Sequence, residues 1–130
     1  MTAFFDTNIL IYAMTRDGRG SVARERLREG GAISTQVLNE FVRVARKKLR
    51  LDWSIVEAAL LEIRTLVDPI QSVAVSTHET AIILAKQHGF DIYDALIVAA
   101  ALEAGCDTLL TEDMQDGRAI QGLAIRNPFR

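Results

Sequence analysis

Residues 95–102 form the longest apolar run of the chain, and all eight of them are aliphatic. A helix that is apolar on every side has to be buried on most of them, so other elements must pack around it. Eight residues are far fewer than the roughly 20 that cross a membrane. With 130 residues, 49% of them hydrophobic and 25% charged, the chain can enclose such a helix in one core. We therefore expect a single domain over residues 1–130.

Short apolar runs alternate with longer helical patterns along the rest of the chain. Strands are predicted over residues 3–5, 32–34, 69–71, 108–111 and 123–125. Helices are predicted over residues 8–14, 21–28, 36–50, 54–67 and 76–87, and from Asp94 to Gly105, with Ser21 and Thr35 as N-caps. Strands that alternate with helices are typical of a parallel sheet covered on both faces. The prediction is an α/β fold, a three-layer α/β/α sandwich with a central, mostly parallel sheet.

Cysteine and histidine are scarce, and charge is unevenly distributed. The chain has one Cys, Cys106, and two His, which excludes an internal disulfide and a cysteine-based zinc site. No secretory leader pattern opens the chain, so we expect a cytoplasmic protein without a membrane segment. Residues 16–50 hold ten Lys or Arg and only four Asp or Glu. These cations either form the solvated face and last turn of a helix or hold an anionic polymer.

Four acidic residues from distant segments are expected at one edge of the sheet. Asp6 follows the first strand, and Asp113 follows residues 108–111. Asp94 opens the apolar helix, and Glu40 borders the apolar stripe of residues 36–50. Because function in parallel α/β folds lies beyond the carboxyl ends of the strands, we expect these four side chains to converge. Each also has a simpler interpretation. Asp94 could be a helix cap and Asp6 a turn acid. Asp113 could be a loop acid and Glu40 an acid at the edge of an amphipathic helix.

Converging carboxylates need a counter-charge. Two carboxylates about 4 Å apart repel each other by about 4 kcal/mol at an effective dielectric constant of about 20. An all-oxygen site without His or Cys suits Mg²⁺ or Mn²⁺, and such ions promote phosphodiester cleavage. Neighbouring hydroxyl and amide groups can orient the carboxylates. The candidates for this supporting role are Thr7, Asn8, Ser34 and Thr111.

Four segments in order along the chain resemble the motifs of the PIN-domain nucleases, and most closely their VapC-type toxin branch. These segments are FDTNIL at residues 5–10, STQVLNEF at 34–41, YDALIVAAA at 93–101 and LTED at 110–113. The resemblance implies an endoribonuclease that uses Mg²⁺ or Mn²⁺ to cleave RNA. It makes Asp6, Glu40, Asp94 and Asp113 the catalytic acids. Asp116 is the alternative to Asp113, because the last motif contains several acids.

The resemblance also implies roles and partners. Asp6, Asp94 and Asp113 would hold the metal, and Glu40 would position it or accept a proton from the attacking water. Arg43 and Arg46 are the candidates for contact with RNA phosphates. A toxin of this kind is held inactive by a cognate antitoxin protein, and the branch is associated with homodimers. Trp53 and Ile55 are candidate surface residues for a dimer, although we expect both to be core residues.

Several other functions remain open at this point. The chain could be a PIN nuclease that processes RNA without being a toxin, but the single bare domain favours the toxin. A non-catalytic protein-interaction module with a PIN-like fold would not require all four acids. A phosphatase of the haloacid-dehalogenase type would need a second Asp where Asn8 stands. A receiver domain would need paired acids beside Asp6 and a late Lys, and neither is present.

Overall fold

The computed structural model describes residues 2–130 as a mixed α/β fold. The strands are β1 (Ala3–Phe5), β2 (Ile33–Ser34), β3 (Ile70–Gln71), β4 (Thr108–Leu110), β5 (Ala119–Ile120) and β6 (Leu123–Arg126). The helices are α1 (Thr7–Tyr12), α2 (Gly18–Glu29), α3 (Thr35–Lys47), α4 (Trp53–Leu66), α5 (Val75–His88) and α6 (Ile92–Glu103). Each predicted strand and helix has a counterpart, and β5 is an additional strand.

The sheet is parallel except at one edge. Its strand order is β1-β4-β6-β5, in which β4 pairs in parallel with both β1 and β6, and β5 pairs antiparallel with β6. The short strands β2 and β3 form a parallel pair of their own. A single parallel bridge between Phe4 and Ala32 connects this pair to β1. The parallel strands place the ends of β1 and β4 side by side, so the residues after Phe5 and Leu110 emerge together.

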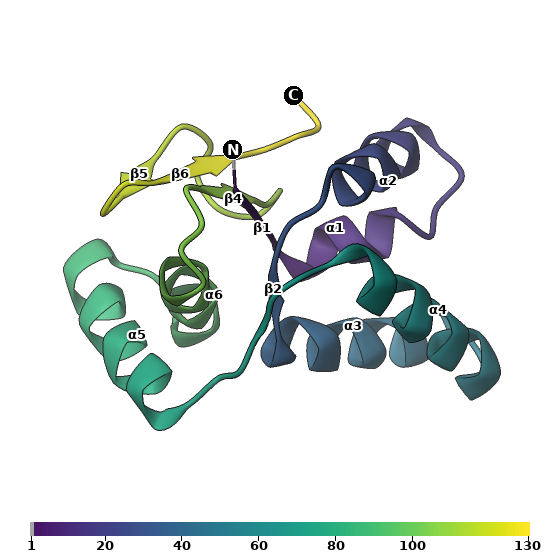
Figure 1. Ribbon diagram of the computed structural model, residues 1–130, viewed down its shortest axis with the longest axis horizontal. Helices are drawn as coiled ribbons and strands as arrows, with labels where there is room; N and C mark the ends of the chain where they lie inside the picture. Colours follow the sequence, from purple (N-terminus) through teal and green to yellow (C-terminus); the bar gives the residue numbers. More distant parts are fainter. Residues whose placement is uncertain (1) are drawn as a thin grey trace.

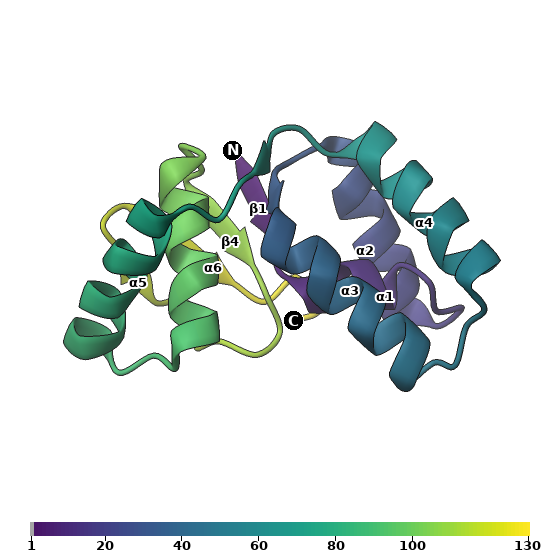
Figure 2. The ribbon, with the colours of Figure 1, turned by 90° about the horizontal axis from the view of Figure 1, so that it is seen from below.

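Helices flank the sheet in two groups. Figures 1 and 2 show α5 and α6 packed together on one side of β1 and β4, and α1 to α4 gathered on the other side. This arrangement confirms the prediction of a central, mostly parallel sheet flanked by helices. Within residues 2–130 the structure contains no helix with the length and apolar character needed to span a bilayer.

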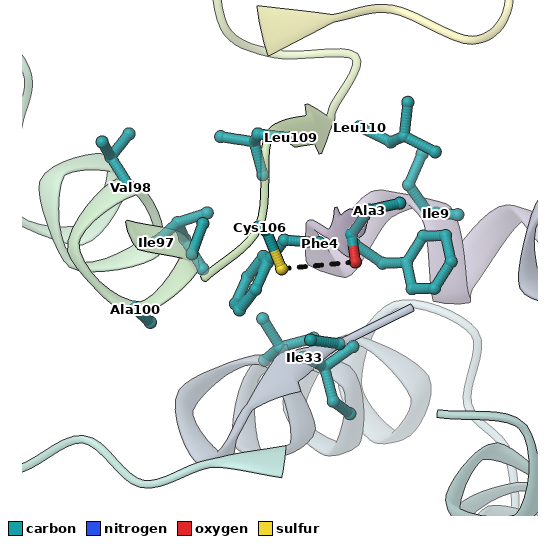
Figure 3. Packing of buried hydrophobic residues seen from close by; sticks show 14 of the residues in the cluster. Ala3, Phe4, Ile9, Ile33, Ile97, Val98, Ala100, Cys106, Leu109 and Leu110 are labelled. Atoms are coloured by element: carbon teal, nitrogen blue, oxygen red, sulfur yellow. Dashed lines mark hydrogen bonds between the residues drawn. The ribbon is translucent and has the colours of Figure 1, made fainter. Parts of the chain in front are cut away.

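The apolar helix is the centre of the core, as predicted. Ala95 and residues 97–101 of α6 are buried. Figure 3 shows side chains of this helix, of β4 and of Ile33 gathered around Phe4. Cys106 is buried in the same cluster, where its thiol donates to the carbonyl oxygen of Ala3 at 3.5 Å. This core fixes the position of α6 relative to the ends of β1 and β4.

Three helices begin at other caps than the sequence suggested. Helix α2 is capped by Asp17, whose Oδ1 accepts from the Gly20 amide at 3.0 Å, and not by Ser21. Helix α3 is capped by Ser34 in place of Thr35. Helix α6 starts two residues before Asp94 and is capped by Asp91. In each case the side chain of an upstream residue accepts a bond from one of the free amide groups of the first turn.

The expectation that Trp53 and Ile55 are core residues is wrong. Trp53 is 53% exposed and Ile55 is 46% exposed. Helix α4 instead turns Val56 and Ile63 inward. The Trp53 ring lies against the guanidinium of Arg46, with 4.7 Å between the Arg46 Cζ and the ring centroid. An inward face that begins at Ile55 and one that begins at Val56 are only one residue apart in the sequence. The structure has the face that begins at Val56.

Candidate active site

The four predicted acids line one cavity of about 590 Å³. Asp6 comes from the end of β1, Glu40 from α3, Asp94 from the first turn of α6, and Asp113 from the loop after β4. Parallel pairing of β1 with β4 brings the first and last of these segments together, although they are about a hundred residues apart in the sequence. The convergence that was expected at the carboxyl ends of the strands is therefore present as a shared cavity.

Asp6 is the most buried of the four acids, with 6% of its surface exposed. It caps α1, since its Oδ1 accepts from the Thr7 amide at 2.7 Å. Its Oδ2 accepts from the Thr111 hydroxyl at 2.7 Å. Burial raises the pKa of Asp6 from 3.8 to about 6 against the lowering effect of these two bonds, and the charges of Asp113 and Glu40 raise it further.

Asp94 is half-buried and free of the capping role that its position suggested. Asp91 caps the helix instead, and its Oδ1 accepts from the Asp94 amide at 2.9 Å. Burial is the largest cause that raises the pKa of Asp94 from 3.8 to about 6, followed by the charges of Asp91 and Asp6. Two carboxyl groups with raised pKa values therefore face a common space.

Glu40 and Asp113 are each oriented by one neighbour from the predicted supporting set, and Glu40 is also oriented by Gln36, which the sequence analysis did not select. The Thr7 hydroxyl donates to Glu40 Oε2 at 2.9 Å, and Gln36 Nε2 donates to its Oε1 at 3.2 Å. Asn8 Nδ2 donates to Asp113 Oδ2 at 3.0 Å. Thr7, Asn8 and Thr111 thus all contact catalytic candidates.

The structure separates Asp116 from Glu112 and Asp113, which both line the acidic cavity. Glu112 forms an ion pair with Arg19, whose Nη1 lies 3.3 Å from its Oε1. Asp113 lines the cavity. Asp116 lines a different hollow, and its Oδ1 accepts from the Asn127 amide at 2.9 Å. Of the two alternatives for the fourth acid, only Asp113 lies with the other three.

Ser34 and Arg46 lie away from the acids. Ser34 is fully buried, and its hydroxyl accepts from the Val37 amide at 3.3 Å as the cap of α3. Arg46 donates to the carbonyl oxygen of Leu51 at 3.0 Å and lies over Trp53. Neither residue lines the acidic cavity.

The cations at the rim of the cavity are Arg43 and Lys48. Sequence reasoning selected Arg43 but missed Lys48. The helical period does not find it, because Lys48 is the C-cap just beyond α3 and Lys47, seven residues after Glu40, is closer in phase. Arg46 follows Glu40 by six residues, which turns it to another side. Lys48 therefore takes the place at the cavity that the sequence analysis gave to Arg46.

The donor set suits a hard divalent cation in type and charge. Every candidate ligand is a carboxylate oxygen, which Mg²⁺ and Mn²⁺ prefer, and the pKa values of Asp6 and Asp94 are raised first by burial and then by neighbouring carboxylates. Among residues 2–130, however, no three His, Cys, Asp or Glu side chains are already arranged around one point. The carboxylates instead hold bonds to Thr7, Asn8 and Thr111, so binding an ion involves a rearrangement of side chains.

Comparison with known families identifies the fold. Residues 3–115 match the family model described as the PIN domain. Because this match spans most of the chain, the chain belongs to the PIN domain family, which confirms the resemblance inferred from the four motifs. No curated protein sequence matches the chain significantly.

Solved structures with the same fold include toxins of toxin–antitoxin pairs. A chain of a toxin–antitoxin complex from Klebsiella pneumoniae is 25% identical, with a TM-score of 0.71 and 98% of each chain covered. VapBC2 from Rickettsia felis, bound to a DNA fragment from its promoter, is 23% identical, with a TM-score of 0.70 and 98% of each chain covered. VapC20 from Mycobacterium tuberculosis, a toxin that cleaves the sarcin-ricin loop, is 19% identical, with a TM-score of 0.67, 83% of this chain and 87% of that chain covered.

Proposed function

We propose that this PIN-family protein is a metal-dependent endoribonuclease that acts as the VapC-type toxin of a toxin–antitoxin pair. The observation that carries the proposal is the cavity in which Asp6, Glu40, Asp94 and Asp113 meet. Two of these carboxyl groups have a pKa of about 6. A site that keeps carboxylates partly buried and close to one another is destabilising unless a cation offsets their charge.

Asp6, Asp94 and Asp113 are the residues that would hold Mg²⁺ or Mn²⁺. When bound, the ion supplies positive charge that offsets the charge developing on the cleaved phosphodiester. Thr111 orients Asp6 through its 2.7 Å bond, and Asn8 orients Asp113 through its 3.0 Å bond. These bonds limit the orientations open to the two carboxylates in the metal-free protein, and metal binding would shift the side chains from there toward the ion.

Glu40 is the candidate proton acceptor. Its two oxygens already receive bonds from Thr7 and Gln36, so the side chain is fixed over the cavity while a lone pair on each oxygen stays available. A carboxylate in this position can take a proton from the water that attacks phosphorus. Glu40 then acts together with the three metal-facing Asp side chains.

RNA is held by the cationic rim. Arg43 and Lys48 are exposed and line the same cavity as the acids. Cations at these positions bind the phosphates that flank the cleaved bond and add affinity without reading sequence. They also offset the repulsion between the polyanionic RNA and the acidic cavity.

A cognate antitoxin is the expected protein partner, and a homodimer is the expected assembly. The Klebsiella and Rickettsia structures of the same fold are described as a toxin–antitoxin complex and as VapBC2. These similarities support the partner. The exposed apolar residues of α4, among them Trp53, Ile55 and Leu61, offer surface for a protein contact.

Three variants test the nuclease. Asp6→Asn and Asp94→Asn should retain the wild-type circular dichroism spectrum and lose Mn²⁺-dependent cleavage of single-stranded RNA by two orders of magnitude or more. Asp116→Asn is the matched control. It removes one charge from the loop that carries Asp113 but lies outside the cavity, and the variant should cleave normally. Folded Asp6→Asn protein with full activity would show that the cavity is not the active site.

A growth assay tests the toxin. Induced expression of the wild-type chain should arrest growth of a bacterial host, and expression of Asp94→Asn should not. Coexpression of the protein encoded by the adjacent reading frame should relieve the arrest. An active nuclease without any effect on growth would instead indicate an RNA-processing enzyme, and an inactive, metal-insensitive protein would indicate an interaction module.

A further inference from the structure

A second hollow of about 450 Å³ adjoins the acidic cavity. The two share three lining residues, Glu40, Arg43 and Tyr93, which therefore form their common border. The rest of the lining of the second hollow is uncharged and consists of Thr35, Gln36, Asn39 and Val73. The acidic cavity and the mostly uncharged second hollow thus adjoin each other, and the Arg43 side chain lies at their border.

Tyr93 is the aromatic residue at this border. It is 63% exposed, although it directly precedes the half-buried Asp94 on α6. Its backbone oxygen accepts from Gln36 Nε2 at 3.4 Å, and the same amide donates to Glu40. This link ties the first turn of α6 to α3 and so sets Tyr93 beside the uncharged wall. An exposed aromatic side chain costs hydrophobic free energy unless a ligand covers it.

The wall formed by α3 carries amide side chains. Asn39 is exposed and lines the second hollow one residue before Glu40. An Asn side chain has both a donor and an acceptor, which match the edge of an unpaired nucleobase. Single-stranded RNA is read by such edges and by stacking of its bases on aromatic side chains.

We propose that the second hollow binds the unpaired base next to the cleaved phosphate, with the base stacked on Tyr93 and its edge bonded to Asn39. The inference rests on the proposed ribonuclease and specifies how that site selects its substrate. Arg43, which lines both spaces, would hold the phosphate between the bound base and the cleaved bond. The aromatic ring of Tyr93 and the amide of Asn39 suit a nucleobase, which has an apolar face and a polar edge.

The test compares RNA with and without that base. The cleavage position is first mapped on cellular RNA by sequencing the new 5′ ends. A short oligoribonucleotide that spans this position is then made with the neighbouring base present or abasic, and it is kept in EDTA so that metal-dependent cleavage does not occur. Binding of both RNAs is measured by fluorescence anisotropy for wild type, Tyr93→Ala and Tyr93→Phe. Trp53→Ala is the control, because this exposed aromatic lines neither space.

We expect Tyr93→Ala to weaken binding of the intact RNA roughly five- to a hundredfold, the range of base stacking on an aromatic side chain. Tyr93→Phe and Trp53→Ala should bind like the wild type. The abasic RNA should bind wild type and Tyr93→Ala equally, because the stacking partner is already gone. Asn39→Ala should change which base is preferred at this position.

Each remaining outcome overturns something specific. If the abasic penalty is the same in wild type and Tyr93→Ala, while wild type binds and cleaves RNA, the base does not stack on Tyr93 and the inference fails alone. If wild type neither binds nor cleaves RNA with Mn²⁺, the proposed function fails and the inference fails with it. Circular dichroism of Tyr93→Ala separates both results from loss of folding.

Discussion

The hydroxyl of Thr111 donates to Asp6 Oδ2 across 2.7 Å, and the same hydroxyl oxygen accepts from the Asp113 amide at 3.2 Å. One buried side chain therefore orients two of the candidate metal ligands. It stands directly after β4, where the parallel pairing with β1 places it beside Asp6. The Thr111 side chain thus links the residue after β1 to the loop after β4.

Replacing Thr111 with Val should damage both stability and activity. The substitution keeps the shape of the side chain but leaves Asp6 without one bond and the Asp113 amide without its acceptor. We expect a loss of about 1–3 kcal/mol in the free energy of unfolding and a marked fall in kcat. Urea denaturation and single-turnover cleavage measure the two effects. Thr108 lies three residues earlier, in β4, and its hydroxyl donates to Asp107. Thr108→Val should therefore leave kcat unchanged.

The stability of the metal-free protein should fall as the pH rises from about 4 to about 6. The pKa of Asp6 is raised in the folded protein, so the folded state binds a proton that the unfolded state has already released. The stabilisation is complete below the unfolded pKa and is lost as the pH passes the folded value. The shift corresponds to a contribution on the order of 2–3 kcal/mol.

Asp6→Asn isolates this contribution from those of other groups. Without metal at pH 8, the variant should be more stable than the wild type in urea denaturation, because it carries no charge in the buried position. The difference between the two proteins should vanish near pH 4. A wild type that is the more stable protein at pH 8 in EDTA would contradict the assignment of the raised pKa.

Divalent metal should reverse the pH effect. Mn²⁺ that binds only the folded protein raises the free energy of unfolding, by about 2.7 kcal/mol at a hundred times the Kd. Because protons compete for the same carboxylates, the stabilisation should be larger at pH 8 than at pH 5. Thermal unfolding with Mn²⁺ and with EDTA measures it. Asp94→Asn should gain little from Mn²⁺, whereas Asp116→Asn should gain as much as the wild type.

RNA binding should depend on Arg43 and Lys48 but not on Arg46. Each phosphate contact with single-stranded RNA contributes about 0.7 to the slope of log Kd against log salt concentration. Arg43→Ala and Lys48→Ala should each lower the slope by about this amount. Arg46→Ala should leave it unchanged, because Arg46 is engaged with Trp53 and Leu51. Equal effects of all three substitutions would indicate a diffuse attraction without defined contacts.

Much of the fold could be predicted because burial imposes patterns on the sequence. The apolar run of α6 and the alternation of strands and helices predicted the parallel sheet, and parallel strands imply that Asp6 and Asp113 meet. The order of the motifs identified the four acids. Strand β5 was missed because only Ile120 of its two residues is buried and its pairing depends on the antiparallel neighbour β6, so the local sequence shows no apolar run.

Details of side-chain engagement could not be predicted from spacing alone. Arg46 and Lys48 are two residues apart and chemically alike, yet Trp53 holds only the first. Asp91 and Asp94 are both plausible caps, and the choice depends on where the helical backbone begins, which is Ile92. Ser34 was assigned to the site and serves as a cap, because a hydroxyl after a strand suits either role until the neighbouring backbone is placed.

The pairing of β1 with β4 also determines when, during synthesis of the chain, the four acids can come together. Thr111 and Asp6 are 105 residues apart, and ribosomes add about 5–20 residues per second. The first strand therefore leaves the ribosome roughly 5–20 s before the residues that complete its cavity. Until then the nascent chain has Asp6 without Thr111 or Asp113. A nascent chain that ends before Asp113 therefore lacks the complete set of the four acids.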